Sequence, residues 1–190
     1  MALVMTLDAR TPIRVSNVST QRKNNQMISN VLMVCHGNLC RSPMAAALLQ
    51  QRVEGLRVGS AGLAAEVGQP AATEAVAVLS EMGIDIQAHR ATQLTRQIAN
   101  DAELILTMTA AQTRSLQSLY PLMRGRIFSI RGFDDADIDD PMGMPISAFR
   151  ACREALAGGI DYWVRRLKSL NEPTGDRVYP EAVCVGGGAQ

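Results

Sequence analysis

A cysteine and an arginine six positions apart, Cys35 and Arg41, are the residues of this sequence best suited to chemistry. A cysteine thiolate is a strong nucleophile, and the planar fork of an arginine guanidinium matches two oxygens of a phosphate. The spacing alone is weak evidence, because such a pair arises easily by chance. The segment between them, residues 36–40, therefore decides how the pair is interpreted.

This segment leaves a short apolar run, Val31–Val34, and enters a helix that is expected from Met44 to about Val53, after Pro43. Loops that leave the carboxyl end of a parallel strand and enter a helix are where such sheets bind ligands. Gly37 and Asn38 tolerate the backbone conformations that turn successive N–H groups inward. These amides and the positive end of the helix predict an anion cradle that holds Cys35 as a thiolate.

Each side chain of the predicted cradle has a role that follows from its type. We expect Cys35 to attack the phosphorus atom of a bound phosphate ester and to form a covalent phosphoenzyme. Arg41 binds phosphate oxygens and stays cationic in the transition state. Ser42 hydrogen-bonds the sulfur and eases its departure when water cleaves the intermediate. The alternative, an inert buried thiol at a strand end, is disfavoured by the glycine, asparagine, arginine and serine around Cys35.

The rest of the pattern alternates between candidate strands and helices. Further strands are expected at Leu56–Val58, Glu103–Thr107 and Arg126–Phe128. A helix is expected from Pro70 to a stop at Gly83, with Ala72, Val76 and Leu79 on one face, and another at Ala110–Leu119, ended by Pro121. A long closing helix carries apolar residues at helical spacing: Phe149, Leu156, Ile160, Trp163, Leu167 and Leu170. This alternation predicts a single α/β domain, a four-stranded parallel sheet flanked by helices on both faces.

The ends of the chain lack sustained periodicity. We expect residues 1–29 to form a flexible N-terminal extension, residues 30–170 to form the folded domain, and residues 171–190 to form a C-terminal tail. The first seven residues are apolar, but they lack a basic start and are too short for a secretory signal. No stretch approaches the roughly 20 apolar residues that span a bilayer. The sequence therefore predicts a cytoplasmic protein.

The composition excludes some classes of partner. Apolar residues make up 47% and charged residues 19%, which is typical of a globular domain. Nineteen basic and 18 acidic residues give a formal net charge of +1, so no electrostatic footprint for nucleic acid or an acidic membrane is present. The four cysteines, Cys35, Cys40, Cys152 and Cys184, form neither a disulfide framework nor a paired zinc set. We expect no metal and no cofactor.

The ten residues Val34–Pro43 closely resemble the signature of the low-molecular-weight protein tyrosine phosphatases, V-C-x-G-N-x-C-R-S-P. The resemblance extends over about residues 30–168 and includes Ser60–Gly62, Gly68–Ala71, Gly83–Asp85, His89–Leu94, Ala102–Met108 and Asp140–Pro141. It implies a protein-tyrosine phosphatase with a flavodoxin-like fold, the phosphotyrosine protein phosphatase I fold. It also implies a phosphotyrosine-containing protein as substrate. Bacterial relatives often oppose a tyrosine kinase, which is therefore a candidate partner.

The resemblance also implies roles for individual residues. Asp140 is the general acid that protonates the leaving oxygen, although four neighbouring aspartates could make this stretch a merely solvated loop, and Asp139 is the second candidate. The phosphate-binding loop comprises His36, Gly37, Asn38, Leu39, Cys40, Arg41 and Ser42, and its supporting hydrogen bonds come from Asn38, Ser42, Ser60 and His89. Cys40 is a possible disulfide partner of the nucleophile, or else a small buried thiol.

Three features differ from familiar tyrosine-specific members. His36 stands where an aliphatic residue is common, Met142 and Gly143 replace frequent aromatic residues, and Ala64 and Ala65 lie in a loop that often supplies another ring. Aromatic walls favour a flat phenyl substrate through stacking, so their absence weakens the tyrosine assignment without affecting the phosphate chemistry. Met142 could substitute as an adaptable apolar contact.

Three alternative functions therefore stay open. A protein-arginine phosphatase shares the scaffold and resembles residues 104–109, but it has a threonine at the position of Leu39. An arsenate reductase of this fold needs a further close pair of cysteines, whereas Cys152 and Cys184 are far apart in sequence. A non-catalytic phosphoprotein-binding module would not need to retain Cys35, Arg41 and a candidate acid.

Overall fold

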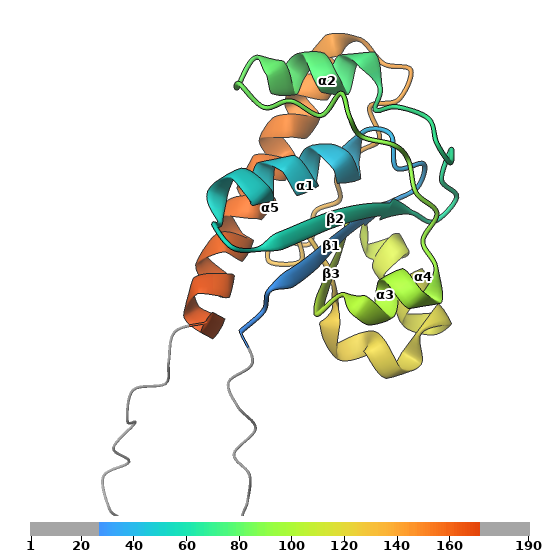
Figure 1. Ribbon diagram of the computed structural model, residues 1–190, viewed down its shortest axis with the longest axis vertical. Coiled ribbons are helices and arrows are strands. Elements are labelled where there is room, and N and C mark those ends of the chain that lie inside the picture. The colour runs from blue at the N-terminus through green and yellow to red at the C-terminus, as the bar shows by residue number, and fades with distance from the viewer. Residues whose placement is uncertain (1–26, 172–190) are drawn as a thin grey trace, which may run out of the picture.

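The computed structural model describes residues 27–171 (Figure 1). The predicted N-terminal extension and C-terminal tail fall almost entirely outside these residues. Four parallel strands form one sheet, in the order β2–β1–β3–β4. Their bounds are Asn30–Cys35 for β1, Arg57–Gly62 for β2, Leu104–Thr107 for β3 and Ile127–Ser129 for β4. The predicted fold class is confirmed.

The central strand β1 is buried on both of its faces. Val31, Met33 and Cys35 contribute to the hydrophobic core on one side of the sheet, whereas Leu32 and Val34 contribute to the core on the other side. A strand covered on both faces is apolar at every position, which explains the continuous run in the sequence. β1 therefore gives the loop that follows it a rigid base.

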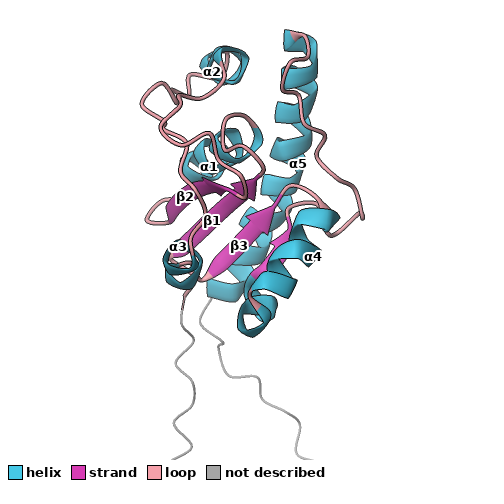
Figure 2. Ribbon diagram, turned by 90° about the vertical axis from the view of Figure 1, so that its right-hand side faces the viewer, coloured by secondary structure: helices cyan, strands magenta, loops and turns pink. Residues whose placement is uncertain are grey.

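Helices cover both faces of the sheet (Figures 1 and 2). One face carries α1 (Arg41–Arg52), α2 (Thr73–Ser80) and the long α5 (Ile146–Asn171). The opposite face carries α3 (Arg96–Asp101), α4 (Ala110–Leu119) and a 3-10 helix, η1 (Pro121–Arg126). None of the helices within residues 27–171 is both long and apolar enough to cross a membrane.

Some bounds differ from the sequence-based expectations. α1 begins at Arg41 rather than at Met44, and α2 begins at Thr73 rather than at Pro70. Backbone hydrogen bonds to Ala91 and to Leu39 hold residues 68–72 against other loops, so the helix cannot start earlier. The residues of α2 that become fully buried are Ala75, Val78 and Leu79, and Leu170 of α5 is 41% exposed. α3 and η1 were not predicted, because they are short and bury few residues.

The carboxyl ends of the strands mark the functional edge of the sheet. The chain runs from β1 outward to β2 and then crosses to β3 on the other side of β1. A ligand site is expected in the crevice at such a switch point, outside the carboxyl ends of the two strands that diverge. The loop from Cys35 to Arg41 lies at this point.

Candidate active site

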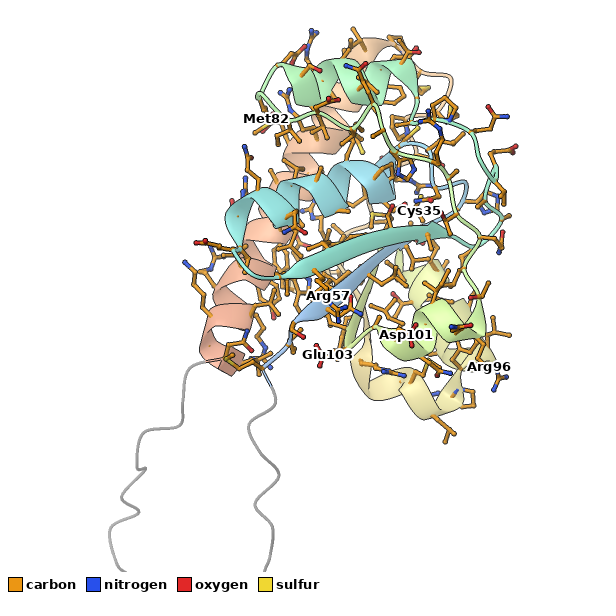
Figure 3. All side chains as sticks on the ribbon, in the orientation of Figure 1. Cys35, Arg57, Met82, Arg96, Asp101 and Glu103 are labelled. Atoms are coloured by element: carbon orange, nitrogen blue, oxygen red, sulfur yellow. The ribbon has the colours of Figure 1, made fainter. Side chains whose placement is uncertain are left out.

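The predicted phosphate loop, residues 35–42, connects the carboxyl end of β1 to the first turn of α1. Figure 3 shows Cys35 at this end of the sheet, while Arg57 and Glu103 lie toward the opposite end. Cys35 is only 2% exposed, yet its side chain lines a pocket of about 150 Å³. The pocket walls are Cys35, His36, Gly37, Leu39, Cys40, Arg41, Glu66, Asp140 and Met142.

Five successive carbonyl groups of this loop accept hydrogen bonds from the segments that surround it. The carbonyls of residues 35–39 bind, in order, Leu63 N, Ala64 N, Glu66 N, His89 Nε2 and Ala72 N, at 3.0, 3.0, 3.2, 2.8 and 2.9 Å. All of these carbonyls therefore turn away from the loop's centre. Because the peptide bonds are trans, the N–H groups of residues 36–40 point in the opposite direction, inward. This is the geometry of an anion-binding nest.

The helix that follows adds to the positive field at this point. The N-terminal cap of α1, Cys40, makes no side-chain hydrogen bond to the first turn, and that turn contains no acidic residue. Its free N–H groups and the helix dipole therefore favour an anion in front of Arg41. Asn38 adopts the left-handed backbone conformation, with φ of 59°, that turns the loop around its centre.

Two hydrogen bonds fix the sulfur of Cys35. Ser42 Oγ lies 2.9 Å from Cys35 Sγ, and the backbone N–H of Asn38 donates to the same sulfur at 3.3 Å. Hydrogen-bond donors that point at a sulfur favour its charged form, so both contacts suit a thiolate. Ser42 also lies where it can stabilise that sulfur as a leaving group.

Arg41 is 5% exposed and is positioned by two contacts beyond its own loop. Nη1 donates to the carbonyl of Ile138 at 3.1 Å, and Nη2 forms an ion pair with Asp140. Nε is buried and has no hydrogen-bond partner among residues 27–171. A buried donor without a partner is costly, so this N–H is available to an oxygen of an anionic ligand.

The residues expected to support the loop do meet in space. The side-chain amide of Asn38 donates to Ser42 Oγ and to Ser60 Oγ, each at 2.9 Å, and its oxygen accepts from Thr92 N at 2.7 Å. Asn38 is completely buried, and His89 binds its carbonyl. All hydrogen-bonding groups of the amide are thus satisfied, and the turn is held in one conformation.

Other contacts at this site were not predicted from the sequence. Glu66 lines the pocket, while Ala64 and Ala65 contribute backbone N–H groups that bind His36 O and the Gln93 side chain, respectively. Thr92 N and Ile138 O support the site only through backbone atoms, and no residue type signals such a role. Two signals in the sequence pointed to the loop that contains Glu66: the segment Ser60–Gly62, and Ala64 and Ala65 in the loop that often supplies an aromatic ring.

Two further cysteines, Cys40 and Cys152, lie in the same hydrophobic core as the nucleophile. Cys40 and Cys152 are both buried free thiols, and burial raises the pKa of each to about 12. Cys152 belongs to α5 and packs in the hydrophobic cluster that contains Cys35 and Cys40. A disulfide between Cys35 and Cys40 stays a prediction. Cys184 lies outside the described residues.

In this chain the first strand of a parallel sheet ends in a cysteine, and the inward N–H groups of the next loop and a buried arginine surround the sulfur. This arrangement defines a class of phosphatases that form a cysteinyl-phosphate. A model of the family described as low molecular weight phosphotyrosine protein phosphatase matches residues 30–172. The probable low molecular weight protein-tyrosine-phosphatase EpsP of Ralstonia solanacearum is 45% identical over 144 residues, 76% of this chain and 99% of that protein. The chain belongs to this family, as its signature led us to expect.

Solved structures agree with this assignment. The YwlE arginine phosphatase from Geobacillus stearothermophilus matches with a TM-score of 0.70 and 38% identity, over 74% of this chain and 94% of that one. Wzb of Vibrio vulnificus, solved in complex with benzylphosphonate, matches with a TM-score of 0.70 and 30% identity, over 73% and 99% of the two chains. The relatives thus include both tyrosine and arginine phosphatases.

Proposed function

We propose that this chain hydrolyses phosphotyrosine in proteins, with Cys35 as nucleophile, Arg41 as phosphate ligand and Asp140 as general acid. The observation that carries the proposal is the set of inward N–H groups above Cys35, fixed by five outward carbonyls. Benzylphosphonate, which the Vibrio vulnificus Wzb structure contains, has a phenyl ring and a phosphonate, as the phosphotyrosine side chain has a ring and a phosphate. That chemistry supports an aryl substrate.

The reaction follows from these positions in two steps. Cys35 Sγ attacks phosphorus and the bond to the tyrosine oxygen breaks, while Asp140 gives a proton to that oxygen. Water then attacks the cysteinyl-phosphate, Asp140 takes a proton from the water, and the sulfur leaves as a thiolate stabilised by Ser42. The inward amides and Arg41 stabilise the transferring phosphoryl group in both steps.

A second candidate is a protein-arginine phosphatase on the same scaffold. A protein-arginine-phosphatase of Geobacillus stearothermophilus is 39% identical over 143 residues. In addition, Glu66 lines the pocket and provides a carboxylate that could pair with the guanidinium of phosphoarginine. Leu39, which lines the same pocket, favours the tyrosine assignment because an apolar wall suits a phenyl ring.

Matched peptides distinguish these functions. We expect the protein to have a higher kcat/KM for a phosphotyrosine peptide than for the same peptide with phosphoarginine, and Cys35→Ser to abolish both activities. Leu39→Thr should shift the preference toward phosphoarginine. A parent protein that binds these peptides but hydrolyses neither would instead be a phosphopeptide-binding module. A cytoplasmic location and a bacterial tyrosine kinase as the partner stay predictions.

A further inference from the structure

A second pocket shares Asp140 with the pocket over Cys35. Its volume is about 360 Å³, and it lies between the 137–141 segment and the first half of α5. A peptide whose phosphorylated side chain reaches Cys35 could therefore place a neighbouring side chain in the second pocket. We call it the flank pocket, lined by Arg131, Asp137, Ile138, Asp139, Asp140, Pro141, Met144, Ala148, Ala151, Cys152 and Ala155.

The floor of the flank pocket is apolar and its α5 residues are small. Ala148, Ala151 and Ala155 leave room above the helix, and Cys152 is 7% exposed. Burial raises the pKa of the Cys152 thiol to about 12, so this thiol is neutral at pH 7. Met144, which is 54% exposed, forms a flexible apolar edge. Such a floor suits a chain of methylene groups rather than a charged group.

The rim of the pocket is acidic, and one of its carboxylates is unpaired. Arg131 is bound by Asp134, Asp140 pairs with Arg41, and Asp137 accepts the N–H of Ala110 at 2.7 Å. Asp139 is exposed and makes no hydrogen bond or ion pair with any part of residues 27–171. One carboxylate is therefore available to a cation at the mouth of an apolar pocket.

We propose that the flank pocket is a substrate subsite that binds a lysine or arginine side chain close in sequence to the phosphorylated residue. The methylene stem would lie on the apolar floor, and the charged end would meet Asp139 at the rim, as long basic side chains commonly do. An acidic side chain at the same position would be repelled by Asp139. This proposal rests on the proposed function, because it places the phosphorylated residue over Cys35.

The test uses phosphotyrosine peptides that differ at one position within three residues of the phosphotyrosine. With lysine, norleucine or glutamate at that position, we expect kcat/KM at low salt to be about fivefold higher for lysine than for norleucine at the best position, and lowest for glutamate. The preference should shrink in 0.5 M salt, because screening weakens an exposed charge pair. A parent enzyme with no preference for lysine at any of these positions would overturn the proposal.

Two variants of the full chain test the pocket itself. Asp139→Lys should reverse the order, so that the glutamate peptide exceeds the lysine peptide, and Ala151→Phe should bring the lysine-to-norleucine ratio close to one by filling the floor. Asp101→Lys is the matched control: it makes the same change of charge on α3, near the opposite end of the sheet (Figure 3). The subsite is rejected if Asp139→Lys and Asp101→Lys give the same ratios.

A small aryl phosphate separates this proposal from the function on which it rests. p-Nitrophenyl phosphate cannot reach the flank pocket and the Cys35 pocket together. One outcome is that the enzyme hydrolyses both this compound and phosphotyrosine peptides in a Cys35-dependent way but shows no preference for lysine. That outcome rejects the subsite alone. Absence of hydrolysis of every phosphotyrosine substrate rejects the proposed function and the subsite with it.

Discussion

The carboxylate of Asp140 forms an ion pair with the guanidinium of Arg41, although 99 positions separate the two residues. The Arg41 side chain is 6% exposed and that of Asp140 is 45% exposed, so the arginine lies beneath the loop that carries the acid. A phosphate bound over Cys35 would compete with Asp140 for the same nitrogen, Nη2.

The first prediction concerns proton donation by Asp140. We expect Asp140→Asn to lower kcat for a phosphotyrosine peptide by about 100-fold and to affect p-nitrophenyl phosphate much less, because nitrophenolate leaves without protonation. Steady-state kinetics on both substrates measure this difference. Asp135→Asn, a change in the same loop outside both pockets, serves as the control. Equal losses on the two substrates would show that Asp140 is not the acid.

The second prediction separates two contributions of Asn38, its buried amide and its positive φ. Asn38→Gly keeps the backbone conformation but removes the bonds to Ser42, Ser60 and Thr92, so we expect about 2 kcal/mol less unfolding free energy. Asn38→Ala should lose about 1 kcal/mol more, because its side chain disfavours a φ of 59°. Urea unfolding measures both values. Equal stabilities of the two variants would argue against backbone strain at this position.

The third prediction tests the close approach of Gly62 to the phosphate loop. A Cβ at Gly62 would lie 2.5 Å from the carbonyl oxygen of His36, so Gly62→Ala must displace that carbonyl. We expect a loss of roughly 1–3 kcal/mol in unfolding free energy and a lower kcat, since the N–H groups of the loop would move. Gly125→Ala is the control, because nothing lies within 4 Å of its Cβ. Activity equal to that of the control would contradict this account.

The fourth prediction is a difference in thiol reactivity. Burial holds the pKa of Cys40 and of Cys152 at about 12, so both should resist iodoacetamide at pH 7, when a thiol with that pKa is almost fully protonated. Cys35 should be alkylated through the pocket, and phosphate or vanadate should protect it. Peptide mass mapping identifies each alkylated cysteine and separates any labelling of Cys184 from labelling of the other three cysteines. If Cys35 reacts like an ordinary free thiol and neither anion protects it, the anion cradle is wrong.

The fifth prediction concerns the pH dependence of the contact between α2 and α5. Hydrogen bonds from Arg150 and Arg153 lower the pKa of Glu81 to about 2, from an ordinary value of 4.5. A lowered pKa stabilises the fold above about pH 4.5, and this contribution disappears as the pH falls toward 2. Glu81→Gln should therefore unfold at a lower temperature than the parent at pH 7 and at the same temperature near pH 2. Glu54→Gln, which changes an exposed carboxylate, should match the parent at both values.

Several features of the fold could be predicted because local patterns determined them. The apolar run of β1 and the bounds of α4 followed from burial on both faces and from the proline after the helix. The start of α2 was placed three residues too early, because the bonds of residues 68–72 to Ala91 and Leu39 come from segments distant in sequence. The helix α3 was missed because it buries only Ala99. Tertiary contacts therefore decided the start of α2 against local propensity, whereas α3 leaves too few buried residues for a sequence pattern to reveal it.

The sequence by itself determined the chemistry, because Cys35, Gly37, Asn38, Arg41 and Ser42 are consecutive parts of one loop and their types fix what each can do. Only the tertiary structure decided where the loop's carbonyls turn, since their donors come from residues 63, 64, 66, 72 and 89. It also brought Asp140 to Arg41 and formed the flank pocket beside them. Nucleophilicity and charge are properties of a residue type, whereas the direction of a dipole and the shape of a pocket depend on contacts between distant segments.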